Sequence, residues 1–229
     1  MDGRKLSFRL VGINNQNFLM ADSETGSWWQ QVTGEAVFGP LAGKRLELVH
    51  HDELSFDLWQ RERPGGQVLR PAADAPWKEF SENWEEETAK LPVVTPAGPD
   101  EPLPPREIVI GVTVNGKTRA YPLSVLAKTS PVLDSVGGVP LALVVAADGK
   151  SVRAFEARLD GQALPLFAKP GSSPPVLIDE GGTEWSFAGE AVSGPHAGRR
   201  LKKVFALKDY WFDWKAYNPE TTVYKAGFR

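Results

Sequence analysis

The chain has 229 residues, a formal net charge of −3 at pH 7 and no cysteine. This length allows one large domain or two small ones, and the slightly acidic balance argues against binding through nucleic-acid phosphates. Without cysteine the chain forms no disulfide, thiolate nucleophile, cysteine-bound zinc site or iron–sulfur cluster. No apolar run is long enough for a membrane span, and the first twelve residues lack the apolar core of a signal peptide.

The first part of the chain predicts short strands followed by a helix. Residues 5–12 and 17–22 alternate apolar and polar side chains, which is the period of a half-buried strand. A short helix is expected over residues 53–63, with Asp52 as its N-cap and Pro64 ending it. Numerous prolines and glycines along the chain favour many turns and short elements.

Residues 75–106 are interpreted as a connecting segment. Its first part has helical spacing, with Trp77, Phe80 and Trp84 on one face, and its second part is rich in proline and must be extended. After this segment strands resume, for example over residues 151–159. A second short helix is then expected near the end of the chain.

One segment occurs twice. Residues 34–46 and 189–201 are identical at ten of thirteen positions, and the same register continues without a gap through Trp59 and Trp214 to Val68 and Val223. This is an internal duplication with a long period, and a tryptophan of each copy is expected to anchor a terminal helix to its sheet. The repeated turn positions, interpreted as structural, are Gly34, Gly39, Pro40, Gly43, Gly189, Gly194, Pro195 and Gly198.

The two copies are unequal in length. Residues 107–159 have no counterpart before residue 1, so the expected organisation is the C-terminal half of one repeat (1–74), a helix with a proline-rich linker (75–106) and a complete repeat (107–229). The expected partner of the incomplete copy is another chain or a missing N-terminal segment, because its strand edges would otherwise be exposed.

Several motifs together resemble a known bacterial and archaeal family. They are VNGKTRAYPLSVL, DSVGGVP, LVGINNQNFLMADSETGSWWQQVTGEA and GPLAGKRL, and they cover nearly the whole chain apart from the linker. The chain resembles the family known as domain of unknown function 3179, whose activity is not established. Members are often exported, so the resemblance implies an extracytoplasmic location.

The resemblance also implies where reactive groups have been lost. The family carries Tyr-Cys-Pro-Leu-Cys after the Gly-Gly-Val-Pro strand and a His-Glu pair before the Asp-x-x-Gly-Gly turn, a set that could bind a metal or cycle a disulfide. Here Ala146 and Gly149 stand at the cysteine positions and Thr129 and Ser130 at the His-Glu positions, while Asp134 is retained. A metal-binding or thiol-redox centre would then lie in the missing N-terminal segment.

Two groups of residues are candidates for a ligand site. Glu35 and its counterpart Glu190 could meet across a pseudo-twofold axis as a carboxylate pair for glycoside hydrolysis, but a structural role in a glycine-rich turn is favoured. Amide side chains beside adjacent tryptophans could hold a sugar or a peptide, although an interface between the copies is favoured. The residues of this ligand-binding hypothesis are Asn15, Asn17, Trp28, Trp29, Gln30, Gln31 and Glu35.

Adjacent strand residues point to opposite faces, so only one of Trp28 and Trp29 can belong to the core. His50, His51 and His196 have no metal-ligand spacing, and the sequence contains no catalytic or nucleotide-binding motif. We therefore expect no catalytic residue, no metal site and no cofactor.

The sequence thus predicts an α+β, mainly β protein with two pseudo-symmetric repeats of short antiparallel strands, each ending in a short helix. The leading functional hypothesis is a non-catalytic binding or scaffold module from an exported protein. The alternatives are a metal-binding or thiol-redox protein and a glycan-binding or glycan-processing protein.

Overall fold

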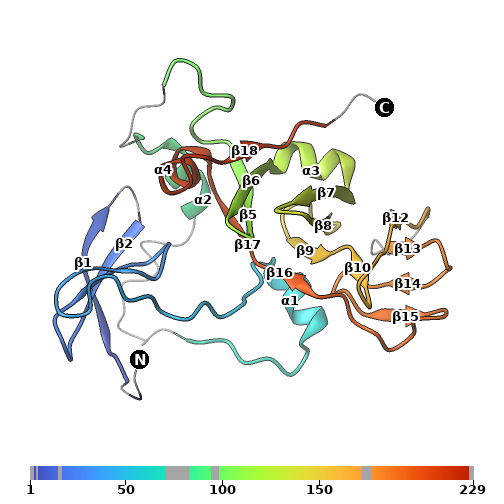
Figure 1. Cartoon of the computed structure of the whole chain (residues 1–229), viewed down its shortest axis with the longest axis horizontal. Coiled ribbons are helices and arrows are strands. Elements are labelled where there is room, and N and C mark those ends of the chain that lie inside the picture. The colour runs from blue at the N-terminus through green and yellow to red at the C-terminus, as the bar shows by residue number, and fades with distance from the viewer. Residues whose placement is uncertain are drawn as a thin grey trace. The chain divides into compact units, whose positions relative to one another are not determined.

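The computed structural model describes Gly3 and residues 5–14, 17–70, 83–93, 98–171 and 177–226. The fold is mainly β, as the sequence predicts, with short and mostly antiparallel sheets and four helices in the described ranges (Figure 1). The chain forms two compact units, Met1–His51 with Val93–Pro96, and Asp52–Pro92 with Ala97–Arg229. Each unit is described by itself.

The first unit is a four-stranded antiparallel sheet in which neighbours in sequence are neighbours in space. Its strands are β1 (Phe8–Asn14), β2 (Asn17–Asp22), β3 (Trp28–Gln30) and β4 (Ala36–Phe38). Trp29 is fully buried and its indole Nε1 donates to Asp22 Oδ2 at 2.8 Å, whereas Trp28 is 40% exposed. The expectation that only one of this tryptophan pair belongs to the core is confirmed.

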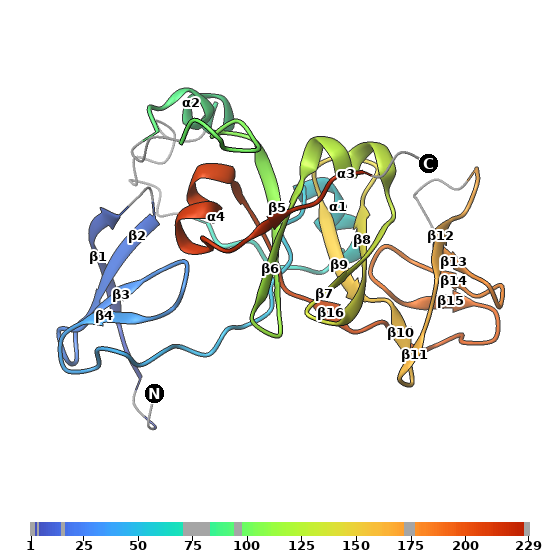
Figure 2. The ribbon, with the colours of Figure 1, turned by 45° about the horizontal axis from the view of Figure 1, so that its top comes forward.

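The described residues of the second unit form three four-stranded sheets and one short hairpin (Figure 2). One sheet is formed by β5 (Ile108–Val114), β6 (Lys117–Pro122), β17 (Ala206–Tyr210) and β18 (Thr222–Val223). A second is formed by β7 (Val132–Val136), β8 (Val139–Val145), β9 (Val152–Glu156) and β16 (Lys203–Val204). The third is formed by β12 (Leu166–Ala168), β13 (Leu177–Asp179), β14 (Glu184–Trp185) and β15 (Ala191–Ser193), and the hairpin by β10 (Arg158–Leu159) and β11 (Gln162–Ala163).

The sheet that contains β8 is the centre of the second unit because both of its faces are buried. Along β8, Leu141, Leu143 and Val145 join a core cluster that includes residues of β5, β6 and α3 (Leu123–Thr129). The alternate residues Ala142 and Val144 face the other way and pack with the β12–β15 sheet. A strand covered on both faces carries a nearly continuous apolar run, as β8 does.

The duplicated segments occupy corresponding places in two sheets. Trp185 Nε1 donates to Asp179 Oδ2 at 3.0 Å in β12–β15, as Trp29 donates to Asp22 in β1–β4. Gly39 and Gly194 both have positive φ, and a Cβ at either would lie within 2.7 Å of a neighbouring backbone Cα. This close approach explains why glycine recurs at this turn. The packing of one copy against the other stays a prediction.

The two helices expected at the ends of the copies are present but are held differently. In α4 (Trp211–Tyr217), Trp214 is buried against Gly111 of β5 and donates to Thr221, so it anchors the helix as expected. In α1 (Phe56–Glu62), Trp59 is half-buried and stacks on the exposed Phe56. The tryptophan therefore anchors only the second helix.

The connecting segment contains α2 (Trp84–Lys90), where Trp84 is 58% exposed. Trp77 and Phe80 lie outside the described residues. The predicted domain limits at 74 and 106 stay predictions, whereas the compact first unit is divided from the second after His51.

Two buried carboxyl groups meet where β17 joins α4. Burial raises the pKa of Asp209 well above its usual range, and the nearby negative charge of Asp213 raises it further. The structure therefore favours the protonated form of Asp209, so the contribution of this group to stability is greatest at low pH and is lost as rising pH ionises it.

Close packing at Gly111 gives a first prediction. A Cβ there would lie 2.3 Å from the Trp214 ring, so Gly111→Ala should destabilise the second unit by about 2–3 kcal/mol in denaturant unfolding. Gly65→Ala is the control, because no atom lies within 4 Å of the added methyl group. Equal unfolding free energies for the two variants would contradict this packing.

The buried carboxyl pair gives a second prediction. Asp209→Asn removes the ionisation that the fold opposes, so its unfolding free energy should exceed that of the wild type at pH 7–8, with the difference shrinking toward pH 4. Thermal unfolding over this pH range measures the effect. The exposed Asp100→Asn should leave the pH profile unchanged.

Candidate functional site

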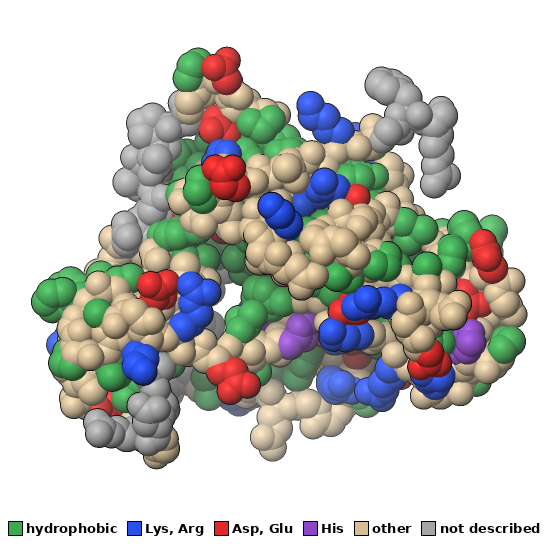
Figure 3. Space-filling view, in the orientation of Figure 1, with side chains coloured by type: hydrophobic (Ala, Val, Ile, Leu, Met, Phe, Trp, Pro, Cys, Tyr) green, Lys and Arg blue, Asp and Glu red, His purple; other side chains and the backbone are tan. Residues whose placement is uncertain are grey.

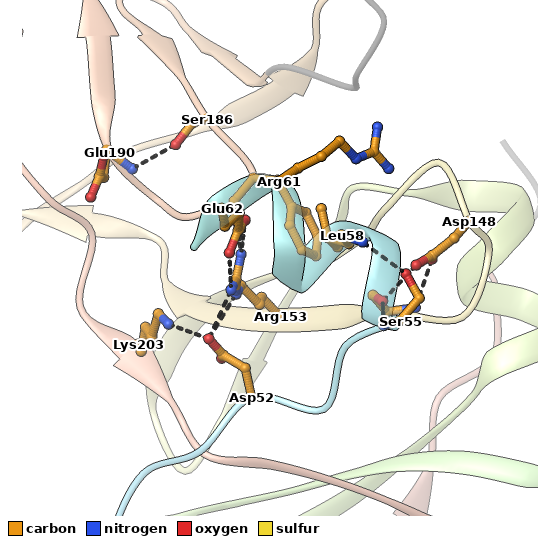
Figure 4. A network of polar contacts seen from close by, with 12 residues as sticks. Asp52, Ser55, Leu58, Arg61, Glu62, Asp148, Arg153, Ser186, Glu190 and Lys203 are labelled. Atoms are coloured by element: carbon orange, nitrogen blue, oxygen red, sulfur yellow. Dashed lines mark hydrogen bonds and ion pairs between the residues drawn. The ribbon is translucent and has the colours of Figure 1, made fainter. Parts of the chain in front are cut away.

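A cavity of about 810 Å³ lies in the second unit beside α1. Its walls are α1 with the residues that precede it, the end of β8 with residues 146–148, part of β9, and the loop of residues 186–190 (Figure 4). This volume is within the range of small-molecule sites. The cavity is therefore the strongest candidate site among the described residues.

The helix α1 forms one wall. Ser55 is its N-cap, with Oγ accepting from Leu58 N at 3.4 Å, and not Asp52 as the sequence suggested. Leu54 and Leu58 pack against the core cluster under β12–β15. A seven-residue helix is not stable alone, so these tertiary contacts hold it in place.

A buried arginine ties α1 to β9. The side chain of Arg153 is 4% exposed, and its guanidinium donates to Asp52 Oδ2 at 2.8 Å and to both carboxylate oxygens of Glu62 at 2.7 and 2.8 Å. Lys203 Nζ lies 2.6 Å from Asp52 Oδ2, and the Arg153 guanidinium lies over the Phe187 ring at 4.7 Å. A buried guanidinium needs such partners, since an unpaired one would be strongly destabilising.

The network also sets the charge state of its carboxylates. Burial raises the pKa of Asp52, but hydrogen bonds from Arg153 and Lys203 and their positive charges outweigh burial and lower the pKa to about 2. Asp52 therefore stays ionised across the physiological pH range.

A second polar cluster holds the N-terminal end of α1. Ser55 N donates to Ser151 Oγ at 2.9 Å, and Ser151 Oγ donates to Asp148 Oδ2 at 2.6 Å. Burial raises the pKa of Asp148, but the hydrogen bonds from Ser151, Lys150 N and the Ser55 hydroxyl hold it well below its usual range. The Asp148 carboxylate is thus ionised, and its oxygens accept hydrogen bonds from these donors.

The loop of residues 186–190 forms the opposite wall. Ser186 Oγ accepts from Glu190 N at 3.2 Å, and the exposed carboxylate of Glu190 pairs with Arg200 at 2.7 Å. Gly189 has φ +79°, and a Cβ there would lie 2.5 Å from the Phe155 ring. The repeated glycine at this position therefore lets the loop lie on β9.

One of the positions at which the resemblance implies reactive groups lies in the wall of this cavity. Ala146 lines it, and Gly149 follows in the same turn. Ser130 Oγ accepts from Val145 N at 2.9 Å, Thr129 Oγ1 donates to Val125 O, and Asp134 binds the Arg119 guanidinium and the Tyr121 hydroxyl. These polar groups hold local structure, and the cavity wall at residue 146 is a methyl group.

The residues of the ligand-binding hypothesis lie on the β1–β4 sheet. Trp29 and Gln30 are buried, while Trp28 is partly exposed and packs against Phe38 at 5.6 Å between ring centroids. Glu35 pairs with Arg45 at 3.0 Å. The ligand-binding role of these residues stays a prediction, with Trp28 as the ring that a ligand can reach.

The other members of that hypothesis are placed as follows. Asn17 begins β2, and Gln31 Oε1 accepts from Phe18 N at 3.4 Å. Asn15 lies outside the described residues.

Histidines do not contribute to the cavity. His50 and His51 are exposed, and His196 lies 6.3 Å from the Trp185 ring. In the described part of the chain, no three His, Asp or Glu side chains gather in a way that could hold a metal ion. No described helix is long and apolar enough to cross a membrane.

Sequence reasoning missed the residues that build the site, chiefly Asp52, Glu62 and Arg153. One signal was available, because Arg153 stands directly before the apolar pair Ala154 and Phe155 on a strand of the complete copy. Its two carboxylate partners are 101 and 91 residues away in the chain, so the sequence offered no means of finding them.

The lowered pKa of Asp52 gives a third prediction. Because the folded value of about 2 lies below the unfolded value of 3.8, Asp52 should contribute about 2 kcal/mol of stability above pH 4, lost as pH falls toward 2. Asp52→Asn should lower the unfolding free energy at pH 7, and it should reduce the loss of unfolding free energy between pH 4 and pH 2. Asp57→Asn, which removes an exposed ion pair, is the matched control and should change stability little.

Comparison with known proteins identifies the family to which the chain belongs. No curated protein and no solved structure matches the chain. The family model described as "Protein of unknown function (DUF3179)" matches residues 1–221, which is nearly the whole chain. The chain therefore belongs to the DUF3179 family.

Proposed function

We propose that this chain is a non-catalytic binding module and that the cavity beside α1 holds a small amphipathic molecule with an anionic group. The observation that carries the proposal is the lining of the cavity. It combines an apolar wall with a network whose described carboxylates are already paired.

The apolar wall is provided by side chains from three parts of the unit. They are Leu54, Leu58, Trp59, Ala146, Ala147 and Phe187. Small-molecule sites are lined mainly by such side chains, with a few polar groups that fix the orientation of the ligand. The apolar body of a ligand fits against this wall.

The polar part of the lining favours an anion. Asp52 and Glu62 are held by Arg153, and Asp148 accepts from hydroxyl and backbone donors. By contrast, the Arg63 side chain lines the cavity and has no partner among the described residues. The polar group of the lining that is left to bind a ligand is therefore the guanidinium of Arg63, which is a donor. A guanidinium suits carboxylate, sulfonate or phosphate groups.

The residues that line the cavity also favour binding of a ligand without catalysis. General acid–base catalysis needs a group whose pKa lies near the working pH, whereas Asp52 and Asp148 are held ionised by their partners. Ala146 supplies a methyl group where the family resemblance places a thiol. We extend the proposal to an extracytoplasmic location, which rests on the resemblance alone.

The fourth prediction tests this site with 8-anilinonaphthalene-1-sulfonate, an aromatic sulfonate whose fluorescence rises on binding. The exposed Ala147 lines the cavity, so Ala147→Trp should fill it and weaken binding at least roughly tenfold. Ala42→Trp places the same side chain on an exposed turn of the first unit and should bind like the wild type. Equal affinity of all three proteins would refute the cavity as the site.

The anionic group is tested by a second comparison. Arg63→Gln should weaken binding of the sulfonate and leave binding of the neutral N-phenyl-1-naphthylamine unchanged. Loss of both probes, or of neither, would contradict the role assigned to Arg63. Circular dichroism of each variant confirms that the fold is retained.

A further inference from the structure

One face of the β1–β4 sheet carries a row of exposed apolar side chains from β1 and β2. Residues that pair directly across β1 and β2 point to the same side, so Phe8, Leu10, Ile13 and Phe18 share a face with Trp29. These four side chains are 40, 56, 66 and 46% exposed. We call them the open face, and Figure 3 shows hydrophobic side chains on the surface of the first unit, at the left of the view.

The corresponding face of the β12–β15 sheet is covered. Leu166 pairs with Asp179 as Phe8 pairs with Asp22, and Leu166 is 1% exposed because it packs in a cluster with Ala142, Val144 and Phe155 of β8 and β9. This sheet therefore completes its core by packing face to face with a second sheet. The described residues of the first unit provide no second sheet.

Gly34 and Gly189, which correspond in the duplicated segment, show the same difference between an uncovered and a covered sheet. A Cβ at Gly189 would lie 2.5 Å from the Phe155 ring of the covering sheet, whereas a Cβ at Gly34 would meet only Leu46, at 3.6 Å or more. The two glycines have similar positive φ values of +79° and +67°. The Phe155 ring therefore fills the space beside Gly189, whereas no described aromatic ring fills the corresponding space beside Gly34.

We propose that the open face is a dimer interface, in which the β1–β4 sheets of two copies of this chain pack face to face. The second copy is the occupant that the face favours because it offers the missing partner, another twisted sheet with a row of large apolar side chains. Like charges do not oppose this pairing. The charged residue of the face, Asp22, is 1% exposed and is satisfied by Trp29 and Thr25, and Arg9 lies on the opposite face.

The exposed area sets the strength of the interaction. Large side chains of this kind present about 200 Å² each, so the measured exposures amount to roughly 400 Å² per copy and about 800 Å² for the pair. This is below the ~1,200 Å² typical of stable complexes. The dimer should therefore be weak and depend on concentration.

The fifth prediction is tested by sedimentation velocity of the full chain between about 10 and 500 μM. The wild type should pass from monomer to dimer over this range, and Leu10→Lys/Ile13→Lys should remain monomeric. Phe167→Lys/Val192→Lys is the matched control, since it changes two exposed apolar residues of the β12–β15 sheet, and it should dimerise like the wild type. A wild-type monomer at every concentration would overturn the proposal, as would a dimer that the open-face substitutions leave intact.

A second measurement locates the contact without substitution. On dilution of the labelled wild-type protein, amide NMR shifts should change in β1 and β2 and stay constant in β8 and β9. Changes confined to other strands would overturn the assignment of the interface to the open face. This measurement remains decisive if the lysine variants fail to fold.

Discussion

The architecture of the second unit depends on one buried positive charge. Arg153 is the second residue of β9, beside the buried Ala154 and Phe155, and its guanidinium has almost no access to water. Such a charge is tolerated only when carboxylates satisfy it, and both carboxylates come from the segment that forms α1. Because α1 has no fully buried residue of its own, this requirement, with Leu54, Leu58 and the Ser55 contacts, holds the helix on β9. The wall of the cavity is thus fixed by electrostatics as much as by packing.

The duplicated segment shows how the same local structure can serve two different surroundings. In both sheets an aspartate receives the indole hydrogen of a buried tryptophan, and a glycine–proline turn approaches the neighbouring backbone too closely for a side chain. These features need only the segment itself, so they recur wherever the sequence recurs. What covers the sheet is not encoded in the segment. The β12–β15 sheet is covered by β8 and β9, whereas the β1–β4 sheet exposes Phe8 and Leu10 on the same face.

Local features could be predicted from the sequence, and long-range ones could not. Alternation identified β1 and β2, the repeated glycines marked residues with positive φ, and adjacency of Trp28 and Trp29 required one buried and one exposed ring. The N-cap of α1 was misassigned because Asp52 and Ser55 are both good caps, and only the distant Arg153 draws Asp52 away from the helix. The candidate cavity was missed for the same reason. Its walls are segments far apart in sequence, brought together by an ion pair that has no local pattern.

The cavity and any chemistry once associated with it are separable in this fold. The positions that the family resemblance marks as reactive, Ala146 and Gly149, lie in the turn after β8, and Asp148 of the same turn holds the N-terminal end of α1 through Ser151. The buried ion pairs that hold the helix lie instead between Arg153 of β9 and the carboxylates of Asp52 and Glu62. The hydrogen bonds that Arg153 donates to Asp52 and Glu62 involve neither Ala146 nor Gly149. Burying Arg153 requires the carboxylates of Asp52 and Glu62, so α1 is held in place and the cavity lies beside it. Selection for a stable core alone would maintain the walls, so the specificity of the site should reside in the residues the core does not need, such as Arg63 at the end of α1.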